Sequence, residues 1–222
     1  MTSTAEMQFL LGEICAEVRE TREHTGCAKL SQRVLEAFAS VPRHAFLPEA
    51  LRPAAYINRP LPIGHEQTIS QPYIVALMTE LLETEAEDVV LEVGTGSGYQ
   101  AALLGRLVRQ VYTLEIIAAL AWQASGRLRD LGLGNVEVRQ GDGHGGWPEH
   151  APFDAIIVTA AAPAVPPALI EQLKPGGRML IPLGPRHGGQ ELQLLRKDAL
   201  GRISRKVVLP VVFVPLTGGA QS

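Results

Sequence analysis

The sequence predicts a single α/β domain in which a doubly wound, mostly parallel sheet ends in an antiparallel C-terminal hairpin. Short apolar, β-branched runs recur roughly every 20 to 25 residues with helix-like segments between them, the pattern of a parallel sheet covered on both faces. Two later runs, Glu191–Arg196 and Val207–Val214, have a connection too short for a crossover helix and predict the hairpin. With 222 residues, 46% of them hydrophobic, the chain can bury a sizeable core. The five parallel runs start near Val89, Val111, Val136, Ala155 and Met179.

The chain before these runs differs in the spacing of its apolar residues and in its proline content. Residues 1 to about 40 carry apolar side chains at helical spacing and are expected to form helices. Residues 41–71 contain five prolines, which exclude a long helix and predict an irregular loop of functional importance. A further proline opens a predicted helix over Tyr73–Leu82, with Ser70 or Gln71 in the capping position.

Composition bounds the classes of function. Lys and Arg number 20 against 23 Asp and Glu, and the net charge of −3 argues against a nucleic-acid binder. No apolar run approaches the ~18 residues of a membrane span, and the N-terminus lacks the pattern of a signal peptide. Cys15 and Cys27 cannot build a disulfide framework. We therefore expect a cytoplasmic protein without nucleic-acid or membrane partners. We also expect a monomer with one domain (1–222), in which a helical and substrate-loop extension (1–82) precedes a core (83–217).

A glycine-rich turn follows the first strand of this core. The run Leu91–Tyr99 has glycines at three alternate positions between a strand and a helix, where the backbone can turn tightly and approach a ligand. A plain turn needs fewer glycines. The dinucleotide fingerprint is G-x-G-x-x-G, but here the third glycine comes one place early and Glu92 stands two places before the first. A carboxylate there favours a cationic cofactor without phosphates.

Two more acidic residues fall at strand ends of the same core. Glu115 closes the second strand about 20 residues past the glycine turn, where a carboxylate can accept both hydroxyls of a ribose. Asp142 comes straight after the third strand and is positioned to reach an adenine edge. Each acid alone is more often a solvated residue, but with Glu92 they occupy the ends of successive strands. The set resembles the class I methyltransferases, and this resemblance implies a Rossmann-like core that binds S-adenosylmethionine.

The methyl acceptor is narrowed by motifs that the chain lacks. Residues 159–163 read Thr-Ala-Ala-Ala-Pro rather than the D/N-P-P-Y type motif of enzymes that methylate nucleic-acid amino groups, and no aromatic residue stands there to stack a base. Neither cysteine lies near a strand end, which argues against cytosine C5 methylation. The six histidines form no H-x-x-x-H pair, so we expect no metal.

The segment Pro60–Ala76, centred on Gln67-Thr68-Ile69-Ser70-Gln71-Pro72, closely resembles the protein-L-isoaspartate O-methyltransferase family. This resemblance implies methyl transfer from S-adenosylmethionine to the free α-carboxylate of L-isoaspartyl residues in damaged proteins and peptides. The products would be S-adenosylhomocysteine and a methyl ester that collapses through a succinimide. Further segments of the chain also resemble this family: Val41–Glu49, Glu92–Ala101, Gly141–Gly143, Ala151–Ala161, Leu173–Gly177 and Val214–Thr217.

The family resemblance and the strand-end pattern together define an expected site. Ser70 is expected to be catalytic and to bind substrate with Gln71 and Val214. A carboxylate is already ionised at pH 7 and needs no general base. The Ser70 hydroxyl and free N–H groups at a helix N-terminus can donate hydrogen bonds to such a carboxylate. Local sequence alone favours a plain helix cap at Ser70, whereas the family resemblance implies a cap that also binds substrate. The residues expected to bind the cofactor are Thr68, Ile69, Glu92, Gly94, Gly96, Ser97, Glu115, Asp142, Gly143 and Thr217.

Three other functions are weighed against isoaspartyl methylation. A class I methyltransferase could use another carboxylate, such as a small acid or a peptide terminus, and the Gln67–Pro72 block disfavours this. A module could hold S-adenosylmethionine without turnover, which the intact Ser70 and strand-end acids disfavour. An NAD dehydrogenase is disfavoured by the glycine spacing together with Glu92.

Overall fold

The computed structural model describes residues 2–185 and 188–219, and the core strands within them form one seven-stranded sheet in the order β5-β4-β3-β6-β7-β8-β9. The first five strands of this order run parallel, whereas β8 is antiparallel to both β7 and β9. The predicted doubly wound, mostly parallel sheet with an antiparallel C-terminal hairpin is confirmed. The strands are β3 (Val89–Val93), β4 (Gln110–Glu115), β5 (Val136–Gln140), β6 (Phe153–Val158), β7 (Leu173–Leu183), β8 (Gln190–Lys197) and β9 (Ile203–Val211).

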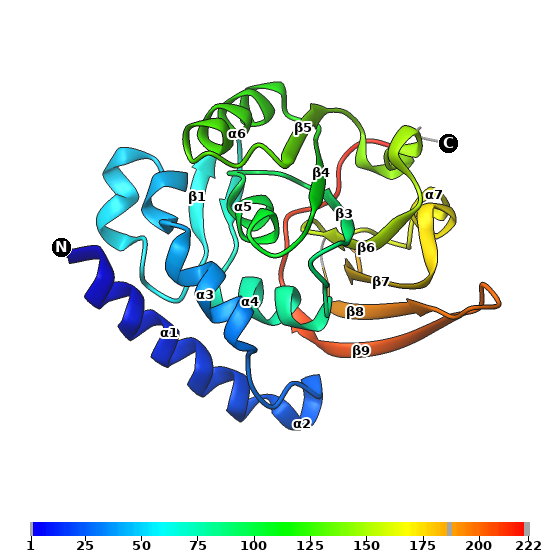
Figure 1. The fold of residues 1–222 in the computed structure, drawn as a ribbon, viewed down its shortest axis with the longest axis horizontal. Helices are drawn as coiled ribbons and strands as arrows, with labels where there is room; N and C mark the ends of the chain where they lie inside the picture. The colour runs from blue at the N-terminus through cyan, green and yellow to red at the C-terminus, as the bar shows by residue number, and fades with distance from the viewer. Residues whose placement is uncertain (1, 186–187, 220–222) are drawn as a thin grey trace.

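Helices cover both faces of the sheet, and α1 (Thr2–Glu20), drawn in dark blue in Figure 1, packs against α3 and α4. Alternate side chains of β6 separate the two cores: Ala155 and Ile157 belong to one buried cluster, Ile156 and Val158 to the other. No helix in the described ranges combines the length and apolarity of a bilayer span. The helices are α1 (Thr2–Glu20), α2 (Arg22–Thr25), α3 (Gln32–Ser40), α4 (Pro72–Leu81), α5 (Tyr99–Gly105), α6 (Ala118–Asp130) and α7 (Pro167–Gln172), with short 3₁₀ turns η3 (Gly143–Gly145) and η4 (Pro148–His150).

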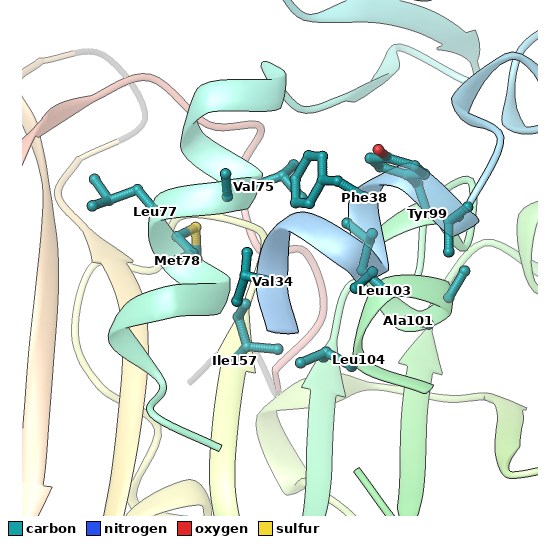
Figure 2. Close-up of a cluster of buried hydrophobic side chains, with 14 of the residues drawn as sticks. Val34, Phe38, Val75, Leu77, Met78, Tyr99, Ala101, Leu103, Leu104 and Ile157 are labelled. Atoms are coloured by element: carbon teal, nitrogen blue, oxygen red, sulfur yellow. The ribbon is translucent and has the colours of Figure 1, made fainter. Parts of the chain in front are cut away.

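The larger core lies where α3, α4 and α5 meet the sheet (Figure 2). Phe38 of α3 is fully buried, and its ring meets Tyr99 edge-on with centroids 6.1 Å apart. Phe46 also meets Tyr99 edge-on, at 5.4 Å. Because Tyr99 is the first residue of α5, the N-terminal extension packs directly against the turn that follows β3.

The proline-rich segment 41–71 is more regular than the predicted loop. It contains two 3₁₀ helices and a small antiparallel hairpin. The hairpin was not predicted because its strands are very short and its turn residues, His65 and Glu66, are not typical of the positive φ values that they adopt, 52° and 57°. The elements are η1 (Arg43–Phe46), η2 (Glu49–Ala54), β1 (Leu61–Gly64) and β2 (Gln67–Ile69).

The terminal hairpin has different bounds from those predicted. β9 starts at Ile203 rather than Val207 and ends at Val211 rather than Val214. Its early residues Ser204–Lys206 are all exposed, as an edge strand permits, and therefore show no apolar alternation in the sequence. After Val211 the chain leaves the sheet edge and reaches the loop that follows β6.

Phe38→Ala should lower the free energy of unfolding by roughly 3 to 5 kcal/mol, because removing a fully buried ring leaves a cavity. Phe9→Ala is the matched control. Phe9 is 70% exposed on α1, so its loss should change stability by no more than about 0.5 kcal/mol. Urea unfolding curves of the two variants measure the difference, and equal losses would contradict this packing.

Candidate cofactor and substrate site

The turn after β3 has the geometry that its glycines predict. Gly94, Gly96 and Gly98 have φ values of 100°, 53° and 90°, a region that glycine enters readily and other residues rarely do. The Glu115 carboxylate holds this turn, accepting hydrogen bonds from Gly96 N at 2.7 Å and from Ile117 N at 2.9 Å. The glycine turn and the end of β4 are thereby joined at the carboxyl edge of the sheet.

A pocket of about 860 Å³ opens at this edge, where β3, β4 and β6 end. We call it the first pocket. Its lining comes from the β2–α4 segment, from the strand ends with the glycine turn, and from the chain after β9. The structure thus brings together most of the residues predicted for the site. Those that line the pocket are Thr68, Ile69, Ser70, Glu92, Gly94, Gly96, Ser97, Glu115, Gly143, Val214 and Thr217.

Glu92 is a carboxyl group buried in the wall of the first pocket. Its Oε2 accepts a hydrogen bond from Thr113 Oγ1 at 2.5 Å, whereas the buried Oε1 has no partner within the described residues. Burial, reinforced by the charge of Glu115, raises the pKa of Glu92 to about 8. An acceptor that is desolvated and incompletely paired suits a cationic ligand, as the sequence predicts.

Asp142 is placed differently from the other predicted residues. Its neighbours Gly141 and Gly143 line the first pocket, but Asp142 itself does not. Its carboxylate accepts hydrogen bonds from His144 N at 2.9 Å and Gly219 N at 2.6 Å. Partial burial works in the opposite direction, but these bonds leave the pKa of Asp142 below its ordinary value. Its contact with adenine stays a prediction.

A second pocket, of about 1070 Å³, adjoins the first. It is lined mainly by apolar residues of α4 and of the chain from Leu209 to Val214, and it includes Gln71 and the α1 residue Glu17. The two pockets share four lining residues, so they meet at a common boundary. The shared residues are Thr68, Ser70, Thr159 and Val214.

Ser70 lies at this boundary and caps no helix. The N-cap of α4 is Gln71, whose side chain makes no capping hydrogen bond, so the interpretation of Ser70 as a helix cap is wrong. The expected free N–H groups are also fewer than predicted, because Pro72 has none and Tyr73 N donates to Asn58 Oδ1 at 3.0 Å. The Ser70 carbonyl accepts a hydrogen bond from Arg43 Nη2 at 2.8 Å.

Thr159 is a site residue that the sequence analysis missed. It follows β6, and its hydroxyl donates to the Gly94 carbonyl at 2.5 Å, joining two walls of the first pocket. Its position directly after a parallel strand was the available signal, the same one that identified Glu115. Nearby, Ala161 N donates to Val214 O and Leu216 N donates to Ala161 O, both at 2.8 Å, which fixes the C-terminal segment along the pocket.

Comparison with known proteins identifies the family. A profile of the family described as protein-L-isoaspartate(D-aspartate) O-methyltransferase matches residues 17–221. The chain belongs to this family. Two curated relatives, each named protein-L-isoaspartate O-methyltransferase 2, are both 59% identical to it. The Syntrophobacter fumaroxidans protein is matched over 95% of this chain and 85% of its own length, and the Polaromonas protein over 94% and 99%.

One solved structure agrees with the family assignment of this O-methyltransferase, and a second supports its fold. One named protein-L-isoaspartate O-methyltransferase has a TM-score of 0.81 at 28% identity, covering 96% of this chain and 66% of that one. A Plasmodium falciparum protein in complex with S-adenosyl-L-homocysteine has a TM-score of 0.75 at 22% identity, covering 93% and 98%, and supports the fold.

S-adenosylmethionine is the cofactor of this methyltransferase family, and the residues of the first pocket fit it. The cofactor carries an ammonium and a sulfonium cation, and the unpartnered Oε1 of Glu92 offers a buried acceptor in the pocket wall. Among residues 2–185 and 188–219, no group of three or more His, Cys, Asp or Glu side chains is placed to hold a metal ion.

Glu92→Gln should flatten the pH dependence of stability in the cofactor-free methyltransferase. The pKa of Glu92 is raised from 4.5 to about 8, so its stabilising contribution is fully present below about pH 4.5 and is lost as the pH rises to about 8. Between about pH 6 and 8.5, the melting temperature of the wild type should therefore fall more steeply than that of the variant. Parallel calorimetric curves would contradict a protonated Glu92.

Proposed function

We propose that this protein transfers the methyl group of S-adenosylmethionine to the free α-carboxylate of L-isoaspartyl residues in damaged proteins and peptides. The observation that carries the proposal is the pair of adjoining pockets, which meet at Ser70. One pocket has the glycine turn and strand-end carboxylates of a nucleoside site, and the other is open, mostly apolar and large enough for a peptide segment. The products would be S-adenosylhomocysteine and a methyl ester that collapses through a succinimide.

Several predicted residues would hold the cofactor in the first pocket. Glu92 would accept from its cationic part, and Glu115 would accept the ribose hydroxyls. Asp142 would receive the adenine edge after giving up its bond to Gly219. S-adenosylmethionine supplies a methyl group that its positively charged sulfur activates. The remaining cofactor contacts would come from Thr68, Ile69, Gly94, Gly96, Ser97, Gly143 and Thr217, all of which line the pocket.

The rate of methyl transfer would depend mainly on how the substrate carboxylate is placed relative to the methyl group. An α-carboxyl group has a reference pKa of about 3.5, so it is ionised at pH 7 and no general base is needed. The Ser70 hydroxyl makes no hydrogen bond within the described residues and is free to donate to a carboxylate oxygen, while Gln71 and Val214 would contact the flanking chain. Holding the reacting atoms in line accounts for rate enhancement without acid–base catalysis.

We further propose that the enzyme acts as a cytoplasmic monomer without nucleic-acid partners. One chain supplies the glycine turn, the strand-end carboxyl groups and Ser70, the net charge is −3, and both cysteines are free.

An isoaspartyl peptide should be methylated at least 100-fold faster than its aspartyl twin of the same sequence. The isoaspartyl link presents an α-carboxylate on a backbone lengthened by one methylene, and a misplacement of ~1 Å at the reacting atoms can cost about 100-fold in rate. Tritiated methyl transfer to the two peptides measures the ratio. Equal rates would favour a general carboxylate methyltransferase instead.

Ser70→Ala should reduce kcat/KM at least ten-fold, or ~1.4 kcal/mol of transition-state stabilisation, while stability stays within about 0.5 kcal/mol of the wild type. Ser31→Ala is the matched control, because Ser31 is a true N-cap that accepts from Val34 N at 3.4 Å. It should cost about 1 kcal/mol of stability without loss of activity. Melting curves and peptide kinetics separate the two variants, and an active Ser70→Ala would refute the role of Ser70.

A further inference from the structure

Arg43 is a buried cation beside the boundary of the two pockets. It has no exposed surface, and its guanidinium donates through Nη2 to the Ser70 carbonyl at 2.8 Å and through Nε to the Ala55 carbonyl at 3.0 Å. Its Cζ lies 5.0 Å from the centroid of the Tyr99 ring. Within the described residues no carboxylate forms an ion pair with it, and Nη1 has no hydrogen-bond partner.

Burying the charge of Arg43 in this way lowers the free energy of unfolding. Burial is the main cause that lowers the pKa of Arg43 to about 10, so the group still carries its charge at pH 7. Two carbonyls and the face of an aromatic ring replace only part of the lost hydration. Apolar side chains of similar volume often replace buried charges without loss of stability. The guanidinium is therefore better explained by what it holds than by packing.

What it holds is the backbone of Ser70. Ser70 precedes α4, caps no helix, and makes no side-chain hydrogen bond within the described part of the chain. Arg43 also contacts Ala55, which follows η2, and the ring of Tyr99, which lines the first pocket. One rigid, planar group thus joins the Ser70 segment to two other parts of the fold, which the single ammonium of lysine cannot do in the same geometry.

We infer that Arg43 is a positioning residue for methyl transfer: by holding the Ser70 carbonyl it sets the direction in which the Ser70 hydroxyl enters the boundary of the two pockets. The inference rests on the role proposed for Ser70. Arg43 lines neither pocket, so its effect on the reaction is indirect, and the residue that it holds at the boundary of the two pockets is Ser70. Its loss should therefore lower kcat more than it changes substrate binding.

The test compares Arg43→Lys with Arg33→Lys. Arg33 is more exposed than Arg43 but is a control for the hydrogen bonding, because it too donates to two backbone carbonyls, Thr84 O at 2.8 Å and Leu107 O at 2.7 Å, and neither residue lines a pocket. Arg43→Lys should lower kcat at least ten-fold, with the peptide KM and the calorimetric Kd of S-adenosylhomocysteine changed less than about threefold. Arg33→Lys should keep kcat within about twofold of the wild type.

Arg43→Met is a second variant that fills the same space without charge. A Met variant that melts no lower than the wild type and has lost kcat at least ten-fold supports the inference. The inference is overturned if kcat of folded Arg43→Lys stays within about twofold of the wild type, if Arg33→Lys loses as much, or if both Arg43 variants fail to fold. A wild type that does not methylate the isoaspartyl peptide, or a fully active Ser70→Ala, would instead refute the proposed function.

Discussion

The parallel pairing of β3 with both β4 and β6 is the constraint on which the site depends. Val93, at the end of β3, lies opposite Leu114 of β4 and Val158 of β6. The next residue of each strand or loop is therefore delivered to the same level of one sheet edge. These residues are Gly94, Glu115 and Thr159. The hydrogen bonds that Glu115 and Thr159 make to the glycine turn then follow from the register. A slip of one strand would take its site residue out of the pocket.

Two buried ionisable groups near that edge are incompletely paired. Glu92 is buried in the sheet and holds a proton at neutral pH, because its burial outweighs the hydrogen bond that Thr113 donates to it. Arg43 is buried in the N-terminal extension with an unpartnered Nη1. Both are poor choices for stability and both are next to the first pocket, by lining it or by packing on the ring of Tyr99. The fold tolerates them because its two apolar cores are large.

The core was predictable from sequence because its signals are local and repeated. Apolar runs at regular spacing determine a parallel sheet, and residues at the ends of those runs must gather at one edge, so Glu92 and Glu115 could be placed before the structure was known. The β1–β2 hairpin and the contact of Arg43 with Ser70 could not. The hairpin strands are too short for a period, and a hydrogen bond between a side chain and a distant carbonyl leaves no trace in spacing. Family resemblance identified Ser70, but only the structure shows that Ser70 caps no helix.

The N-terminal helix α1 contributes one residue, Glu17, to the second pocket. Glu17 of α1 accepts a hydrogen bond from Asn58 Nδ2 at 2.8 Å, and Asn58 Oδ1 accepts one from Tyr73 N. The Asn58 side chain therefore links α1 to the start of α4. Burial is the main cause that raises the pKa of Glu17. Apart from this carboxyl the pocket is lined almost entirely by uncharged groups, which suits an enzyme whose substrates share one damaged linkage and little else. Under the proposed function, selection of the substrate would then be made at the boundary of the pockets, where Arg43 holds the backbone of Ser70 just before α4.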